Sequence, residues 1–162
     1  MPDDKKQKDE KRYKTVSVNR IARHEYEVLR TVECGLVLTG SEIKSIRQGK
    51  VQLRESFARP AKGEIWLHGA HIAQYAAASL ADNHEPDRPR KLLLHREQIE
   101  DLSLEVESQG LTLIPLRMYF KEHRVKLELA LGRGRKQYDK RQAIAKRDAE
   151  RRMRVAIRQR TK

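Results

Sequence analysis

The segments LTLIPLRMYF (residues 111–120) and RVKLELAL (residues 124–131) decide the fold, because they predict two β-strands joined by the short link 121–123. In the second segment, apolar and charged residues alternate: Val125, Leu127, Leu129 and Leu131 against Arg124, Lys126 and Glu128. Successive side chains of a strand point to opposite faces, so this pattern predicts one buried and one exposed face. Pro115 cannot donate to a strand ladder and predicts an edge or a bulge in the first strand.

Shorter elements flank this hairpin on its N-terminal side. Strands are predicted at 35–40, 51–60 and 64–72, with a turn at Lys62–Gly63. Helices are predicted at 19–26, capped by Asn19, at 41–48, capped by Ser41, and at 95–109, ending before Gly110. Several short strands with a few short helices predict a mainly β fold: a small antiparallel barrel of the oligonucleotide-binding type with helical additions. Periodicity does not determine the strand order.

Charge divides the chain into three parts. Residues 132–162 hold 13 Lys/Arg and 3 Asp/Glu, a net charge of +10, whereas residues 19–131 carry +1 and residues 1–18 carry +2. We therefore expect a polar, disordered N-terminus (1–14), a barrel domain (15–131) and a basic C-terminal tail (132–162). A nearly neutral body with a cationic tail indicates a large anionic partner. Nucleic acid ranks above an acidic protein or a membrane surface, because the tail lacks a broad apolar face.

The tail begins with the run GRGRKQYDKR (132–141). Its glycines would let the backbone approach RNA closely, its cations could reach phosphates, and Tyr138 offers a ring on which an unpaired base can stack. The alternative is a solvated basic linker. Beyond Asp139 the tail contains neither Gly nor Pro, and we expect it to be disordered when free and helical once its charges are neutralised.

Several classes of function are not expected. The single cysteine, Cys34, excludes an internal disulfide and a cysteine-based zinc site, and it is expected to be a small buried hydrophobe in a protein of the reducing cytoplasm. His68 and His71 are three apart on a predicted strand, so they cannot hold one metal ion. There is no signal peptide, membrane-spanning run, phosphate loop or nucleophile motif. We expect no cofactor, no metal, no membrane association and no catalysis.

A set of motifs in fixed order gives a sharper interpretation. The segments NRIARHEY, ECGLVLTGSEIKSIRQGKVQL, RESFARPAKGEIWLHGAHI, PDRPRKLLLHREQI, GLTLIPLRMYFKEHRVKLELALGRGRKQYDKR and KRDAER strongly resemble the SsrA-binding protein (small protein B) family from about residue 17 onward. The resemblance implies a bacterial factor that binds the tRNA-like domain of transfer-messenger RNA (tmRNA) and delivers it to stalled ribosomes for trans-translation. Its partners would be tmRNA, the ribosome and, through tmRNA, elongation factor Tu, with the protein as a monomer.

The resemblance also implies roles for individual residues. Those expected at tmRNA are Asn19, Arg20, Arg23, His24, Glu33, Leu93 and His95. Those expected at the decoding centre and in the empty mRNA channel of 16S rRNA are Arg133, Arg135, Lys136, Tyr138, Asp139, Lys140, Arg141, Arg147, Arg151, Arg154 and Ile157. Some members of the family have Asn in place of His95, which argues against a specific imidazole chemistry there. Some have His in place of Tyr138, and either ring can stack on a base of the decoding centre.

Two other classes remain open on composition and motifs. A structural ribosomal protein also combines a small barrel with a basic extension. An RNA-processing enzyme could use His24 or His95 as an acid or base, although no paired acid and base is visible in the sequence.

Overall fold

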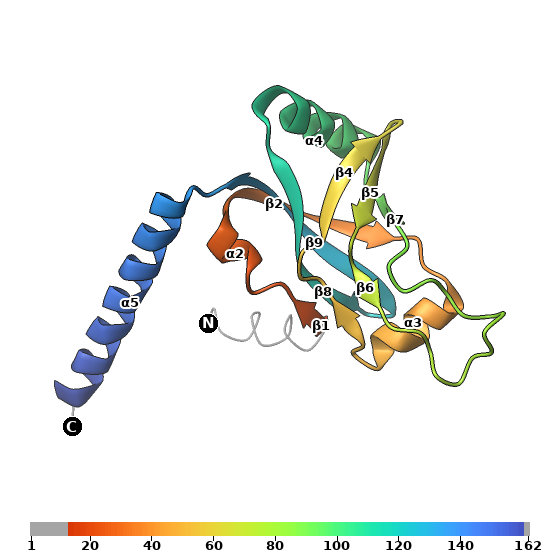
Figure 1. Cartoon of the computed structure of the whole chain (residues 1–162), viewed down its shortest axis with the longest axis horizontal. Helices are drawn as coiled ribbons and strands as arrows, with labels where there is room; N and C mark the ends of the chain where they lie inside the picture. The colour runs from red at the N-terminus through yellow and green to blue at the C-terminus, as the bar shows by residue number, and fades with distance from the viewer. Residues whose placement is uncertain (1–12, 161–162) are drawn as a thin grey trace, which may run out of the picture.

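The computed structural model describes residues 13–160, which form an antiparallel β-barrel followed by one long helix (Figure 1). The main sheet contains β1 (Tyr13–Val18), β2 (Tyr26–Leu36), β4 (Phe57–Ala61), β5 (Glu64–His68), β7 (Arg90–Leu93), β8 (Thr112–Lys121) and β9 (Arg124–Gly134). Their order is β1-β8-β4-β5-β7-β2-β9, and pairing of β8 with β9 closes the sheet. A short second sheet pairs β3 (Val51–Gln52) with β6 (His71–Ile72). The predicted mainly β barrel is confirmed.

The β8–β9 hairpin forms as predicted, with Lys121 opposite Arg124. The register shifts between Pro115 and Arg117, which confirms the bulge predicted from the proline. Leucines on the inner face of the hairpin are fully buried, and they pack with residues of β5 and β7, with Ile46 of α3 (Gly40–Arg47) and with Leu102 of α4 (Arg96–Gln109). The two helices therefore extend the core beyond the barrel strands.

The last strand of the barrel extends three residues beyond the boundary predicted after residue 131. Strand β9 continues to Gly134, and Tyr26, Glu27 and Val28 of β2 pair with residues 134, 133 and 132. A Cβ atom at Gly132 would lie 3.2 Å from the carbonyl oxygen of Glu27 and 3.3 Å from Cδ1 of Ile114. In this structure Gly132 therefore serves the close packing of β9 against β2 and β8, and not an approach of the backbone to RNA.

Most of strand β2 was not predicted. Its residues 26–34 mix charged and apolar side chains without clean alternation, so that only the end near Gly35 was identified, and the strand predicted at 35–40 is wrong beyond Leu36. The helix predicted at 19–26 is the single turn α2 (Ala22–Glu25). The N-terminal segment expected to be disordered lies outside the described residues, except for Tyr13 and Lys14, which belong to β1.

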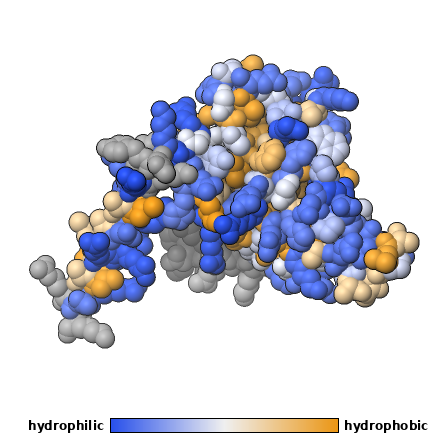
Figure 2. Space-filling model, in the orientation of Figure 1, coloured by the Kyte–Doolittle hydropathy of each residue, from blue (hydrophilic) through white to orange (hydrophobic). Residues whose placement is uncertain are grey.

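The C-terminal tail forms α5 (Gln137–Arg160), which confirms that this part of the chain is helical. Figure 1 shows α5 leaving the barrel beside α2 and running away from the sheet. On the side seen in Figure 2, hydrophobic and hydrophilic side chains are interspersed along α5. Disorder of the tail in the free protein stays a prediction. Within residues 13–160, no helix is long and apolar enough to span a membrane.

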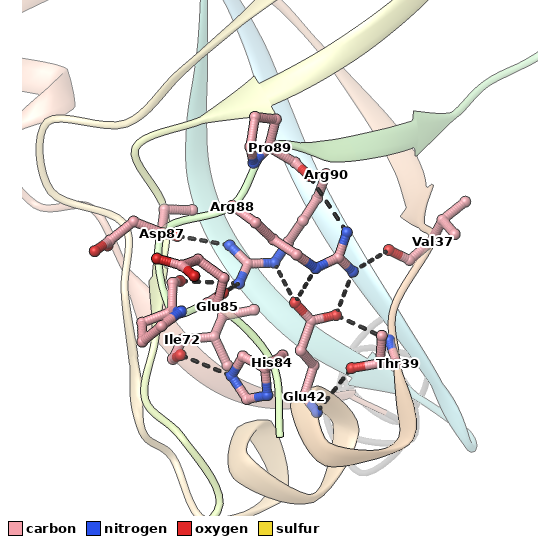
Figure 3. A network of polar contacts seen from close by, with 12 residues as sticks. Val37, Thr39, Glu42, Ile72, His84, Glu85, Asp87, Arg88, Pro89 and Arg90 are labelled. Atoms are coloured by element: carbon pink, nitrogen blue, oxygen red, sulfur yellow. Dashed lines mark hydrogen bonds and ion pairs between the residues drawn. The ribbon is translucent and has the colours of Figure 1, made fainter. Parts of the chain in front are cut away.

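A buried ion network links α3 to the loop before β7 (Figure 3). The carboxylate of Glu42 accepts hydrogen bonds from the guanidinium groups of Arg88 (2.8 and 2.6 Å) and Arg90 (2.8 Å). Glu42 also caps its own helix, since Oε2 accepts from the N–H of Thr39 (2.8 Å), so the cap is Thr39 and not Ser41 as predicted. Arg90 is fully buried, and it also donates to the carbonyl oxygens of Ala70 and Pro86.

The network determines the charge state of Glu42. Burial alone would raise the pKa of its carboxyl group, but the hydrogen bonds from Arg88, Thr39 and Arg90 outweigh burial and lower the pKa below 4.5. A carboxyl group whose pKa is lower in the folded state stabilises the fold above its unfolded pKa, and this stability is lost as acid protonates it. As the pH falls below about 4.5 and through the lowered pKa of Glu42, the stability that comes from the link between α3 and β7 should therefore be lost.

We predict that Glu42→Gln lowers the free energy of unfolding by about 3–5 kcal/mol, because it leaves the buried charge of Arg90 without a counter-charge. Urea unfolding at pH 7 measures the change. Glu100→Gln is the matched control, since Glu100 pairs with Arg96 on the exposed side of α4 and its loss should cost no more than about 0.5 kcal/mol. Equal, small losses in both variants would show that the network does not hold α3 in place.

Candidate nucleic-acid interface

One exposed side of the barrel runs across β7, β2, β9, β8 and β1. Cross-strand partners point to the same side of a sheet. Gly35 of β2 lies opposite Leu93 of β7 on one side and Lys126 of β9 on the other. Lys126 in turn lies opposite Tyr119 of β8, and Lys121 of β8 lies opposite Tyr13 of β1. Together with Glu33, Arg117 and Glu128, these residues define what we call the outer face.

Glu33 lies near the middle of the outer face and is held by two neighbours. The hydroxyl group of Tyr119 donates to Oε2 of Glu33 (2.5 Å), and Nζ of Lys121 donates to Oε1 (3.1 Å). The hydrogen bond from Tyr119 lowers the pKa of Glu33, with Lys121 and Lys126 acting in the same direction against a smaller effect of burial. Glu33 is therefore an ionised, oriented carboxylate, and with 37% of its side chain exposed it can accept further hydrogen bonds.

Tyr119 is almost fully buried beneath other groups of the outer face. The guanidinium carbon of Arg117 lies 4.8 Å from the centroid of its ring, and the ring of Tyr13 meets it edge-on at 5.7 Å. Burial and the bond to Glu33 raise the pKa of Tyr119, so its hydroxyl group stays a donor. Base edges in RNA present amino groups that donate, so a fixed carboxylate among cations can read a base while the cations attract the backbone.

Leu93 adds an apolar group to the same face. It is 50% exposed and lies opposite Gly35, where a Cβ atom would come within 3.3 Å of Cβ of Leu93. Leu93 borders a hollow of about 430 Å³ that is also lined by Arg124 and Lys126. His95 is exposed and precedes α4, where its backbone N–H donates to Oε1 of Gln98 (3.2 Å). The structure therefore brings Glu33 and Leu93 onto one face and leaves His95 at its margin.

Asn19 is buried, whereas its predicted role in tmRNA binding requires an exposed side chain. Its amide group donates to the carbonyl oxygens of Leu53 (3.2 Å) and Pro115 (3.1 Å). Its Oδ1 accepts from the N–H of Ala22 (3.3 Å) near the start of α2, but the N-cap of α2 is Ile21 and not Asn19 as predicted. All polar atoms of this side chain are thus used inside the protein, so Asn19 orients α2 and does not present its amide to RNA. Arg20, Arg23 and His24 are exposed next to it.

The residues expected at the ribosome follow one another from β9 along α5. Arg133 is exposed at the end of β9, and the backbone N–H of Arg135 donates to the carbonyl oxygen of Glu25 (2.8 Å). The side chains of Tyr138, Asp139 and Lys140 lie outside the described residues. The remaining members of the set are exposed on the protein surface: Lys136, Arg141, Arg147, Arg151, Arg154 and Ile157. Arg147 also contacts the barrel domain, through His24.

Sequence reasoning missed Arg117, Tyr119 and Lys121 as part of the interface. Their spacing of two residues on one strand, with an aromatic ring between two cations, is the signal that could have identified them. The prediction for Cys34 is confirmed: it is buried, and burial raises the pKa of its thiol to about 12. Among the described residues, His, Cys, Asp and Glu form no cluster that could hold a metal ion.

We predict that Tyr119→Phe raises the pKa of Glu33 towards its ordinary value, because the largest interaction that stabilises the carboxylate is removed. Carboxyl-carbon NMR titration of the free protein measures the change. Tyr13→Phe is the control, since it keeps the ring packed on Tyr119 and removes no bond to Glu33. A pKa of Glu33 that is the same in wild type and Tyr119→Phe would contradict the assigned geometry.

Known proteins share most of this sequence. The model of a family described as SmpB protein matches residues 16–159. An SsrA-binding protein of Desulforudis audaxviator is 54% identical over 145 residues, which cover 90% of this chain and 94% of the relative. One of Thermosynechococcus vestitus is 52% identical over 147 residues, covering 91% and 97%.

A solved structure is similar over most of the chain. It is described as "tmRNA-SmpB: a journey to the center of the bacterial ribosome", and its matching chain has a TM-score of 0.63 and 46% sequence identity. The match covers 79% of this chain and 93% of that one. Because the family model spans nearly the whole chain and the relatives are about half identical over nine-tenths of it, the chain belongs to the SmpB protein family.

Proposed function

We propose that this chain binds the tRNA-like domain of tmRNA through the outer face and delivers it to stalled ribosomes for trans-translation. The observation that carries the proposal is the fixed carboxylate of Glu33, held by Tyr119 and Lys121 on a face that also presents Leu93. Such a face suits unpaired or splayed bases, which offer both hydrogen-bonding edges and apolar rings. The names of the relatives and of the similar structure support the same RNA as the partner.

The distribution of charge supports a division of labour between barrel and tail. With a net charge of +1 over residues 19–131, the barrel cannot rely on general attraction, so its affinity for tmRNA depends on shape and specific contacts. The tail, with a net charge of +10, supplies contacts to phosphates. We assign it to the decoding centre and the empty mRNA channel, with Tyr138 stacking on a base and the motif Asp139–Arg141 beside it.

Other parts of the function follow from these assignments. Elongation factor Tu would meet the protein through tmRNA, and action on the ribosome would place a monomer in the cytoplasm. The protein is an RNA-binding factor in this account, and no reaction is assigned to His24 or His95.

We predict that a chain ending at Lys136 binds the tRNA-like domain with an affinity within tenfold of wild type but no longer supports peptide tagging. This end point retains β9 and the bond from Arg135 to Glu25, and it removes α5. Gel-shift titration measures binding, and a translation reaction on a truncated message measures tagging. A hundredfold loss of affinity for the tRNA-like domain would refute the division between barrel and tail.

We further predict that Glu33→Ala and His95→Ala weaken binding to the tRNA-like domain without changing its salt dependence, because neither removes a contact between a cation and a phosphate. Filter binding at several salt concentrations measures both quantities.

As the counterpart, joint replacement of Arg133, Arg135 and Lys136 by Ala should lower the salt dependence of ribosome binding. The wild-type slope there is expected to be about −4 to −5 if half of the tail cations are engaged. The interpretation would be contradicted if Glu33→Ala or His95→Ala changed the salt slope of binding to the tRNA-like domain while the triple variant left the salt slope of ribosome binding unchanged.

A further inference from the structure

A cleft separates the tail from the barrel where α5 passes α2. It has a volume of about 630 Å³, and it is lined by charged or ring-bearing side chains from α2 and the segment before it, from β8 and β9, and from α5: Arg20, Arg23, His24, Arg117, Glu128 and Arg147. We call it the junction cleft. It adjoins the outer face, because Arg117 and Glu128 belong to both.

The junction cleft has an excess of positive charge. Four guanidinium groups line it, and its one carboxylate, Glu128, is already bonded to Nε of Arg117 (2.5 Å). Among the described residues, no carboxylate forms an ion pair with Arg20, Arg23 or Arg147. Guanidinium groups gathered without counter-charges repel one another and favour an anion between them, and their planar donors suit phosphate oxygens.

Arg147 contacts the imidazole ring of His24. Its Nη1 atom lies 2.7 Å from Nε2 and 3.0 Å from Nδ1 of His24. A guanidinium group can only donate, so a ring nitrogen of His24 that accepts from Arg147 must be one without a proton. This bond lacks the charge assistance that a phosphate oxygen would give, so a phosphate is the stronger partner for Arg147.

We propose that the junction cleft is a binding site for an RNA phosphate, which replaces His24 as the acceptor for Arg147. The proposal rests on the proposed function and adds to it a site shared by barrel and tail. Bound there, the phosphate contacts Arg20 and Arg23 from the barrel side and Arg147 from α5. It therefore couples RNA binding to the direction of α5. The phosphate can come from tmRNA or from ribosomal RNA.

Binding measurements on the full-length chain test the site. The test variant is Arg147→Ala, and the matched control is Arg152→Ala, which lies on α5 outside the cleft and is not among the residues expected at the ribosome. If the bound phosphate belongs to tmRNA, Arg147→Ala should weaken binding of the isolated tRNA-like domain about three- to tenfold and lower the salt slope of that binding by about 0.7–0.9. The control variant should then bind the tRNA-like domain like wild type. If the bound phosphate belongs to ribosomal RNA, Arg147→Ala should weaken ribosome binding and lower its salt slope by the same amounts relative to the control variant. If the two variants have the same affinity and the same salt slope with each of the two RNAs, the proposal is overturned.

A distance measurement tests the coupling. Spin labels at Glu97→Cys on α4 and Gln159→Cys near the end of α5 report the direction of the tail, and Cys34 is buried and does not compete for the label. The distribution of distances should narrow when RNA binds wild type, and it should stay broad in Arg147→Ala. An identical distribution in both would overturn the coupling. If wild type binds neither RNA, the proposed function itself fails, which is a different result from loss of the site alone.

Discussion

The architecture depends on β9 being paired along both edges. On one side it forms the hairpin with β8, and on the other it pairs with β2 from Gly35 back to Tyr26. This double pairing closes the barrel, and it fixes which side chains of three long strands point outward. Glu33 and Tyr119 come from strands far apart in sequence, and they meet because both flank the same stretch of β9. The same pairing carries β9 through Gly134 and thus determines where the tail leaves the barrel.

Charged groups play two different roles in this molecule. Glu42 and Arg90 are buried and bonded to each other, and they connect α3 to the sheet. Arg90 also donates to the carbonyl oxygen of Ala70, and Glu42 accepts from the N–H of Thr39. Glu33 and Lys121 form a pair on the surface, where solvent weakens the attraction, so their value lies in orienting a carboxylate more than in stability. A barrel of small net charge can therefore be specific for an RNA, while a tail of large net charge contributes general affinity.

Elements with strong local signals were predictable from the sequence, and those that depend on distant contacts were not. Alternation in residues 124–131 and the proline at 115 correctly gave the β8–β9 hairpin and its bulge. Strand β2 was largely missed, because its charged residues face a surface formed only by tertiary packing. Glu33 was identified through family motifs. Its partners Tyr119 and Lys121 required the register between strands, and the internal role of Asn19 required the position of Leu53.

The central claim is that the outer face, and not the basic tail, recognises the RNA cargo. Amide NMR spectra of the full-length protein, recorded during titration with the isolated tRNA-like domain, test it most directly. The account predicts that the largest changes occur at Glu33, Leu93, Tyr119 and Lys126, while residues 151–159 of α5 keep their signals. Changes concentrated in residues 151–159, with the outer face unaffected, would contradict it.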